Sequence, residues 1–253
     1  MRRALAGLAS LALLVPACGG SGSDRSEITV LAAASLTAAF TKIGADFERA
    51  NPDVTVRFSF GPSDGLATQI LEGAPADVFA PASPTYMDQV QTDGPGVSGR
   101  ADFARNTLAV VVPSGNPAHI ESLDDLARPG VKLVLAAVGV PAGDYAREIL
   151  GSAGIQKEAL ANVVSNEEDV KGVVQKVLLG EADAGIVYGT DVTPDISANV
   201  REIAIPDGVN VIATYPIAVI NGSSHTPAAT AFIQYVVGPG QTTLRSFGFL
   251  PPS

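Results

Sequence analysis

Three stretches of this sequence place small or hydroxyl-bearing residues where a β-prone run ends and a helical pattern begins. They contain Ser35, Ser63 and Ala142, and the stretch before Val170 is another predicted helix start. The first turn of a helix offers backbone N–H groups without an intrahelical acceptor, together with the positive end of the helix dipole. Several such helix starts that converge can bind an anion without Arg or Lys. The two serines could equally be ordinary N-caps, because serine is a preferred capping residue.

One of these stretches, residues 61–65, also matches a nucleophile motif. Its sequence Gly-Pro-Ser-Asp-Gly fits the G-x-S-x-G turn between a strand and a helix, in which the serine attacks an ester. A serine hydrolase using Ser63 is therefore a competing hypothesis. It needs an acid and then a histidine later in the chain, where the only histidines are His119 and His225. We place it below a binding function, because no HGGG-like oxyanion loop is present and the motif follows only two predicted strands.

Other chemistries have less support in the sequence. Two separated histidines and one cysteine cannot form a zinc cage, and the acidic residues are scattered over helix faces. Residues 94–99 match G-x-G-x-x-G by letter, but no strand precedes them as a dinucleotide-binding turn requires. We therefore predict no metal site and no cofactor.

The N-terminus resembles a bacterial lipoprotein signal. Two arginines precede an apolar run over residues 4–15, which is too short to span a bilayer as a helix. Cys18 follows Val-Pro-Ala and is the only cysteine of the chain. We predict export, a signal peptide at 1–17, a lipid anchor on Cys18 at the extracytoplasmic face of the cell membrane, and a flexible tether at 18–26.

The negative net charge of the chain disfavours some classes of binding partner. The formal net charge is −10 at pH 7, and removal of the two N-terminal arginines leaves 14 basic and 26 acidic side chains, a net charge of −12. A chain this acidic is not expected to bind nucleic acid or anionic lipid surfaces. No later stretch has the roughly 18 consecutive apolar residues of a membrane span. We expect the mature chain to be soluble and monomeric.

Strand and helix patterns alternate along the mature chain. β-prone runs occupy 28–33, 54–60, 77–80, 108–112, 131–137 and 185–188, and apolar residues at helical spacing mark 36–47, 66–71, 86–90, 142–150 and 170–178. The segment 209–220 is predicted to be extended and broken at Pro216. This alternation favours an α/β fold with largely parallel sheets.

A short internal sequence repeat indicates that the chain uses one topology twice. Leu-Glu-Gly at 71–73 leads to Ala76-Asp77 and a strand, and Leu-Gly-Glu at 179–181 leads to Ala182-Asp183 and a strand. Both stretches have a helix end, a glycine, an Ala-Asp pair and a strand. This repeat favours two lobes of related topology.

Six motifs, in order along residues 28–249, resemble those of the periplasmic molybdate-binding proteins of ABC importers. They are Ala32-Ala33-Ala34-Ser35-Leu36-Thr37, Gly73-Ala74-Pro75-Ala76-Asp77-Val78-Phe79, Val140-Pro141-Ala142-Gly143, Glu168-Asp169-Val170, Gly185-Ile186-Val187-Tyr188-Gly189 and Tyr215-Pro216-Ile217-Ala218-Val219. The resemblance implies a two-lobe, periplasmic-binding-protein-like fold of type II with a ligand cleft between the lobes. The lobes would comprise 27–107 plus 213–253, and 108–212.

The resemblance also implies a ligand and its contacts. The function would be that of a receptor, not an enzyme, that binds molybdate and also tungstate and delivers them to an ABC permease. Another tetrahedral oxyanion, such as sulfate, is the alternative ligand. The ligand-binding residues would be Ser35, Ser63, Ala82, Ala142, Val170 and Tyr188, the last through its phenol.

This chain departs from the family pattern at three positions near the expected site. The family often has a run of serines where this chain has Pro62 and Asp64 around Ser63. It also commonly has a small polar residue where this chain has Pro81. An acidic side chain beside a dianion is unfavourable unless it points outward.

Overall fold

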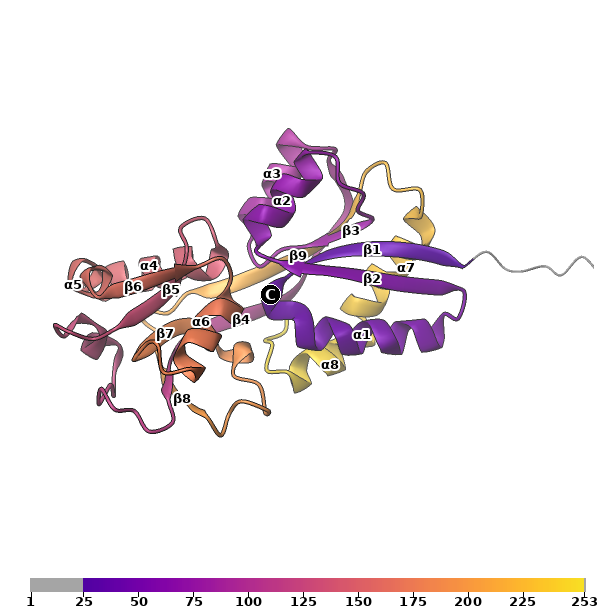
Figure 1. The fold of residues 1–253 in the computed structure, drawn as a ribbon. Helices are drawn as coiled ribbons and strands as arrows, with labels where there is room; N and C mark the ends of the chain where they lie inside the picture. Colours follow the sequence, from indigo (N-terminus) through magenta and orange to yellow (C-terminus); the bar gives the residue numbers. More distant parts are fainter. Residues whose placement is uncertain (1–24, 253) are drawn as a thin grey trace, which may run out of the picture.

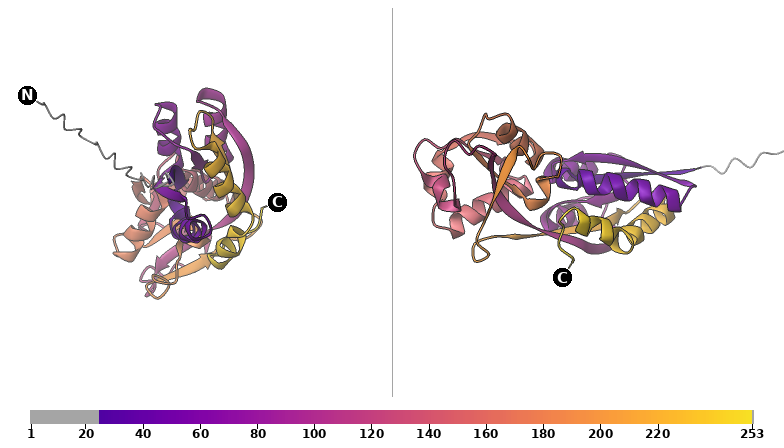
Figure 2. Two further views of the ribbon diagram at one scale, coloured as in Figure 1. Left: turned by 90° about the vertical axis from the view of Figure 1, so that its right-hand side faces the viewer. Right: turned by 90° about the horizontal axis from the view of Figure 1, so that it is seen from below.

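Two α/β lobes lie side by side and are joined by two long strands in the computed structural model, which describes residues 25–252 (Figures 1 and 2). The predicted signal peptide, Cys18 and most of the predicted tether lie outside the described residues. The tether was predicted to reach residue 26, but the first strand already begins at Ser26. Within 25–252, no helix is both long enough and apolar enough to cross a bilayer.

The first lobe is a five-stranded sheet with helices on both faces. Strands β2, β1 and β3 are parallel, and β9 and β4 continue the sheet antiparallel. Helices α1, α7 and α8 cover one face, and α2 and α3 cover the other (Figure 1). The bounds are β1 Ser26–Ala33, β2 Val54–Gly61, β3 Val78–Ala80, β4 Val97–Pro113, β9 Ile212–Ile220, α1 Thr37–Ala50, α2 Ser63–Leu71, α3 Pro84–Asp93, α7 Thr226–Val237 and α8 Gly240–Ser246.

The second lobe repeats this plan around a shorter sheet. Strands β7, β5 and β6 are parallel, and the second half of β4 pairs antiparallel with both β7 and β8. Short 3-10 helices follow β1 and β7 and precede β5. The bounds are β5 Leu133–Ala136, β6 Val163–Glu167, β7 Ala184–Tyr188, β8 Val200–Ala204, α4 Pro141–Ser152, α5 Gln156–Ala161, α6 Val170–Leu178, η1 Ala34–Leu36, η2 Leu123–Ala127 and η3 Gly189–Asp191.

Strand β4 changes partner on its way from one lobe to the other. Thr107 is the last β4 residue paired with β9, opposite Ile212, and Leu108 is the first paired with β7, opposite Tyr188. The predicted limit between the lobes falls at the same point, although the extent of each lobe stays a prediction. The fold class itself, a two-lobe α/β binding-protein fold, is confirmed.

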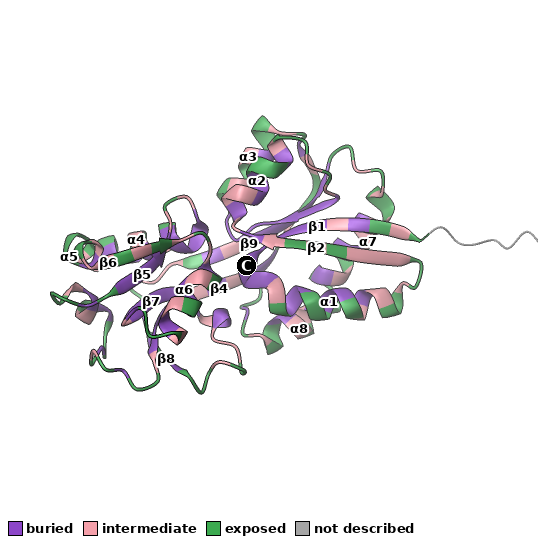
Figure 3. Ribbon diagram, in the orientation of Figure 1, coloured by how far each residue is buried: buried purple, intermediate pink, exposed green. Residues whose placement is uncertain are grey.

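Buried residues gather on the strands and on the helix sides that face them (Figure 3), and most of these residues are apolar. In the first lobe, Phe47 of α1 and Phe232 of α7 meet edge to face with ring centroids 5.4 Å apart. On the opposite face, Leu66 of α2 and Phe79 of β3 are buried in a second apolar cluster. Burial of each such side chain is worth about 1.5–3 kcal/mol relative to exposure. The helix starts are therefore fixed on rigid layers.

The repeated Ala-Asp motif has the same hydrogen bonds in both lobes. Asp77 donates its N–H to the carbonyl of Thr29 over 2.9 Å and accepts the N–H of Thr29 over 2.7 Å. Asp183 and Lys132 exchange the equivalent bonds, both 2.8 Å long. The glycine before each motif has a positive φ, 89° and 69°, as the turn requires. Each aspartate thereby fixes the start of one parallel strand against its neighbour, so the two stretches share one structure.

Two expectations about the strands were wrong. The sheets are not largely parallel, because four strand pairs are parallel and four are antiparallel. Pro216 does not break the last strand, because β9 runs through it opposite Asp102. The register with β4 shifts next to this pair, between Asp102 and Ala104. An irregular position tolerates the missing N–H of proline without loss of a regular ladder bond.

Candidate anion-binding site

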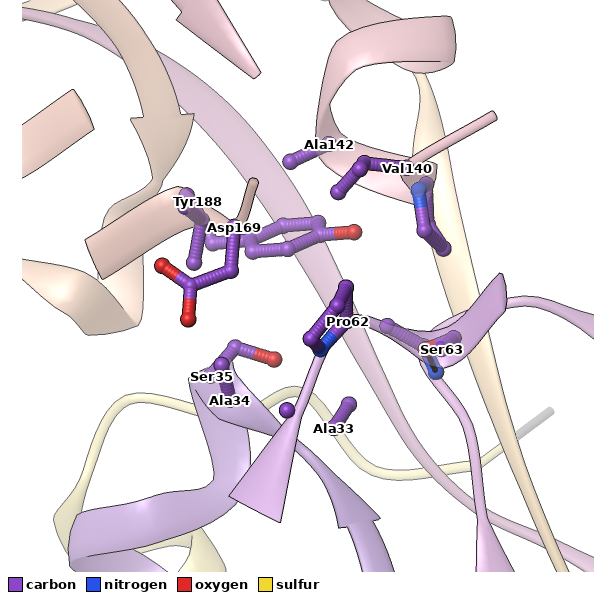
Figure 4. Close-up of a pocket in the computed structure, with 13 residues that line it drawn as sticks. Ala33, Ala34, Ser35, Pro62, Ser63, Val140, Ala142, Asp169 and Tyr188 are labelled. Carbon is purple, nitrogen blue, oxygen red and sulfur yellow. Dashed lines mark hydrogen bonds between the residues drawn. The ribbon is translucent and has the colours of Figure 1, made fainter. Parts of the chain in front are cut away.

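A small cavity lies where the strands of both lobes end (Figure 4). Its empty volume, which includes space open to solvent, is about 230 Å³, so it is a small hollow. All six residues that the resemblance implied as ligand contacts lie in its wall. The lining residues are Ala33, Ala34, Ser35, Gly61, Pro62, Ser63, Ala82, Val140, Pro141, Ala142, Asp169, Val170 and Tyr188.

The wall is built from helix starts of both lobes. The first lobe supplies η1 after β1 and α2 after β2, and the second supplies α4 after β5 and α6 after β6. These strands are parallel within each lobe, so their carboxyl ends lie at one edge. The N-cap residues of α2 and α4 are Pro62 and Val140, and neither has a side chain that caps the helix. First-turn N–H groups of these helices therefore still need an acceptor from outside the helix.

The first turn of α4 packs closely against the end of β5. A Cβ atom on Gly143 would lie 2.2 Å from the carbonyl oxygen of Ala137 and 2.4 Å from that of Ala136. Only glycine fits there without movement of the helix. The main chain alone thus fixes the position of the Ala142 N–H at the cavity wall.

The hydroxyl groups of the two serines serve tertiary contacts and do not cap their helices. Ser35 Oγ lies 3.1 Å from the hydroxyl oxygen of Tyr215. Ser63 Oγ accepts the N–H of Ala82 over 3.0 Å. The explanation of these serines as N-caps is therefore wrong. Because Ser63 Oγ acts as an acceptor toward Ala82, its own proton can be donated into the cavity.

Tyr188 places a hydroxyl group in the cavity (Figure 4). The side chain is 1 % exposed, and its hydroxyl has no hydrogen-bond partner among residues 25–252. Burial raises the pKa of Tyr188 well above its usual range, so the group remains a proton donor. A buried, unsatisfied hydroxyl costs about 1–3 kcal/mol. A ligand oxygen in the cavity would remove this cost.

The cavity wall contains no cationic side chain. None of its thirteen residues, all within the described part of the chain, is Lys, Arg or His. Asp169 even contributes a carboxylate, which the sequence placed in a motif but not in the site. It is the N-cap of α6 and accepts the N–H of Gly172 over 2.9 Å. An anion in the cavity would have to be held by neutral donors and helix dipoles.

Asp64, in the first turn of α2, does not line the cavity, and its Oδ1 is buried without a hydrogen-bond partner in residues 25–252. Its Oδ2 is 3.9 Å from the place that a Cβ on Gly139 would occupy. The hydroxyl of Tyr86, from α3, donates to the carbonyl of Gly139 in the other lobe. Burial, together with the charges of Asp64 and Asp144, raises the pKa of Tyr86 to about 12. The acidic residue that departs from the family pattern thus belongs to an inter-lobe contact, which the sequence did not predict.

The hydrolase hypothesis fails at Ser63. A nucleophilic serine needs a base within hydrogen-bond reach. His225 instead lies 3.2 Å from Asp77 Oδ1, at the start of α7. His119 lies in a loop and lines no part of the cavity. The G-x-S-x-G sequence therefore marks a strand-to-helix turn and not an active site.

Asp191 lies behind Tyr188 and was not predicted from the sequence. Its carboxylate accepts the backbone N–H of Tyr188 over 3.1 Å. Burial raises the pKa of Asp191 to about 7, although the bond from Tyr188 and the charge of Lys171 act in the opposite direction. Asp191 stands among Gly189, Thr190 and Thr193, a composition typical of an exposed turn, so its burial could not be predicted from the sequence.

Comparison with known proteins assigns the fold to a family. Residues 28–250 match the family described as bacterial extracellular solute-binding protein. The molybdate-binding protein ModA of Mycobacterium tuberculosis is 39% identical over 251 residues, which cover 98% of this chain and 94% of that protein. The periplasmic molybdate-binding protein of Azotobacter vinelandii has a similar solved structure, with a TM-score of 0.79 and 18% identity over 89% of this chain and 100% of that chain.

The fold alone also resembles a receptor for another oxyanion. The sulfate-binding protein SubI of M. tuberculosis has a TM-score of 0.76 and 20% identity over 89% of this chain and 87% of that chain. Fold and cavity together define a two-lobe binding protein for a small solute. This chain belongs to the bacterial extracellular solute-binding proteins, and it is a binding protein and not an enzyme.

The first prediction concerns stability and Asp191. Between about pH 4 and 7 the carboxyl is ionised in the unfolded chain but protonated in the folded one, so the folded protein loses stability as pH rises through this range. Asn is neutral and can still accept the Tyr188 N–H. Asp191→Asn should therefore raise the free energy of unfolding at pH 8, by up to about 4 kcal/mol, and much less at pH 4.

Urea unfolding at both pH values measures this difference. Asp195→Asn is the matched control, because Asp195 lies in the loop that follows Asp191 and is exposed. Equal pH dependence of unfolding in the wild type and Asp191→Asn would show that the carboxyl ionises normally.

Proposed function

We propose that this chain is a molybdate receptor of an ABC importer and that it also binds tungstate. One observation carries the proposal: helix starts from both lobes and the unpartnered Tyr188 hydroxyl converge on one small cavity. The name of the relative with 39% identity supports molybdate as the ligand. No bond of the ligand is made or broken in this function.

The proposed contacts use neutral donors from each lobe. The first lobe gives the hydroxyls of Ser35 and Ser63, and the second gives the first-turn N–H groups at Ala142 and Val170 and the phenol of Tyr188. All of these donors bind oxygen atoms of the anion, so no residue is a ligand of the metal atom. Hydrogen bonds to a charged acceptor are stronger than neutral ones, at about 1.5–3 kcal/mol each. The proposed set compensates for the lack of a cation in the wall.

The proposed role of Ala82 is indirect. Its N–H already donates to Ser63 Oγ, so it orients the serine hydroxyl toward the cavity. The resemblance implied a direct contact at this position. A supporting role agrees better with the hydrogen bond that the structure contains.

Selection between oxyanions would depend on size. Molybdate and tungstate are nearly equal in size, whereas sulfate is smaller. Donors fixed on packed helix starts fit one tetrahedral radius best. Sulfate therefore remains the alternative ligand, and competition between anions decides between them.

The proposal also covers how the protein is anchored and where its ligand goes. The receptor would be held at the membrane through the lipid on Cys18, act as a monomer and pass its ligand to a permease. The lobes 27–107 plus 213–253 and 108–212 would close on the ligand, because the donors come from both and cannot all reach it when the cleft is open.

The test of the function is thermal melting with molybdate, tungstate, sulfate and phosphate. A ligand that binds only the folded state raises the melting temperature, by an amount that grows with the ratio of its concentration to its dissociation constant. We expect large, similar shifts with molybdate and tungstate and smaller ones with sulfate and phosphate. If none of the four anions moves the melting temperature, the receptor proposal is wrong; a larger shift with sulfate would favour the alternative.

The second prediction concerns Tyr188→Phe. The variant removes one donor to the anion, so the affinity for molybdate should fall about ten- to a hundred-fold. The unliganded variant should melt no lower than the wild type, because its hydroxyl has no partner to lose. Calorimetric titration and melting of the same samples measure the two effects.

Tyr215→Phe is the matched control for this prediction. Its hydroxyl contacts Ser35 Oγ, so its removal should lower the melting temperature of the unliganded protein. Unchanged molybdate affinity in Tyr188→Phe would exclude the phenol from the site.

The third prediction concerns the contact between the lobes. Tyr86→Phe removes the hydrogen bond to the Gly139 carbonyl, which exists only while the lobes are close. A net loss of about 0.5–1.5 kcal/mol should weaken binding roughly two- to twelve-fold. The change should come mainly from faster dissociation of molybdate, which stopped-flow measurements can follow.

Tyr235→Phe provides the control, because Tyr235 packs on Phe47 within the first lobe. Both variants remove one phenol oxygen, but only the first affects a contact between lobes. Equal dissociation rates in Tyr86→Phe and the wild type would show that this contact does not hold the closed form.

A further inference from the structure

A second hollow adjoins the anion cavity on the side of α6. It is a groove between the lobes, lined by Thr37 and Ala38 of the first lobe and by Lys171, Gln175 and Asp191 of the second. Ser35 lines both the groove and the anion cavity. The groove therefore gives solvent a path to the back of the anion site, where Asp191 lies.

Asp191 is linked to the anion site by contact and by charge. Its carboxylate accepts the backbone N–H of Tyr188 over 3.1 Å, so it fixes the residue that carries the buried phenol. Its charge also adds to the effect of burial in raising the pKa of both Tyr188 and Tyr215. Tyr215 in turn contacts Ser35. An anion held by Ser35 and Tyr188 would thus face the Asp191 charge across the same two phenols.

The charged groups nearest Asp191 act on it in opposite directions. Lys171 of α6 favours the ionised carboxyl, and Asp169, the N-cap of α6, disfavours it. Asp195, from the loop that follows, lines the same groove but is exposed, and it is not among the charges that shift the pKa of Asp191. Tyr188 from β7 and Tyr215 from β9 are the remaining titratable neighbours, and both are neutral donors. A dianion in the cavity would therefore favour the protonated form of Asp191.

We infer that Asp191 is a proton-linked positioning residue of the anion site: it holds the backbone of Tyr188 and takes up a proton when the oxyanion binds. The inference rests on the proposed function. It adds that the receptor binds its dianion together with a proton that enters through the groove. The carboxyl then loses the charge that would repel the ligand but keeps an oxygen for the Tyr188 N–H.

Affinity should consequently depend on pH in a defined direction. Because burial raises the pKa of Asp191 to about 7, the carboxyl of the unliganded protein is protonated below that pH and ionised above it. The dissociation constant of molybdate should therefore rise about three- to ten-fold from pH 6 to pH 8. Molybdate itself remains a dianion over this range, so its own protonation does not contribute.

The test is calorimetric titration of the purified protein with sodium molybdate at pH 6, 7 and 8, in two buffers of different ionisation enthalpy. The difference in heat between buffers counts the protons taken up. The wild type should take up a fraction of one proton at pH 7. Asp191→Asn should take up none, change affinity less than about two-fold over this pH range, and bind more tightly than the wild type at pH 8.

Two further variants separate charge from position. Asp191→Ala should also show no pH dependence, but should bind more weakly than Asp191→Asn at every pH, because the Tyr188 N–H loses its acceptor. Asp195→Asn should keep the wild-type profile. Histidines titrate in the same range, so the double variant His119→Gln, His225→Gln serves as a control and should also keep that profile, since neither histidine lines the cavity or the groove.

The outcomes distinguish this inference from the proposed function. Molybdate binding without proton uptake by the wild type, or a wild-type pH profile in Asp191→Asn, would overturn the inference and leave the receptor function intact. The wild-type measurement alone decides this if a variant fails to fold. Absence of any molybdate binding would defeat both.

Discussion

The first-turn N–H groups of a helix have no acceptor inside that helix, and they are costly to bury unless something outside accepts from them. In this protein, α2 and α4 begin with Pro62 and Val140 at their N-caps, which supply no capping oxygen. Parallel strands in each lobe bring these starts to the facing edges of the lobes. The N–H groups that still need an external acceptor thus lie in the wall of the cavity, which both lobes form.

Much of this could be predicted from the sequence, because helix starts, strand runs and the repeated Ala-Asp motif are local patterns. Local patterns pointed to the helix starts at Ser35, Ser63, Ala142 and Val170, whereas Ala82 and Tyr188 came from the family resemblance; all six line one cavity. Three contacts between separate elements could not be predicted from the sequence. They are the contact of Tyr215 with Ser35, the hydrogen bond of Tyr86 to Gly139, and that of Tyr188 to Asp191. Strand β8 and the first half of β4 were missed because polar residues interrupt them. The predicted break at Pro216 failed because a register shift accommodates the proline.

The path of β4 and β9 determines how the two halves of the site are related. Each strand passes between the lobes, and their antiparallel pairing forms the connection. A bend of such a ladder preserves the hydrogen bonds within each lobe, so the packing that fixes the helix starts is unaffected. In the proposed closure, contacts across the cleft, such as Tyr86 to Gly139, would be the ones that form and break. The packed layers of each lobe would stay unchanged in that movement.

The cavity wall consists largely of Ala, Gly, Pro and Val, whose side chains contribute little chemistry. What distinguishes the site is therefore the course of the main chain, which many different sequences can share. The fold that carries this main chain is shared with a structure of only 18% identity. A binding site built from main-chain groups therefore tolerates substitutions that would destroy one built from charged side chains, as long as the small residues that let the helix starts approach are kept.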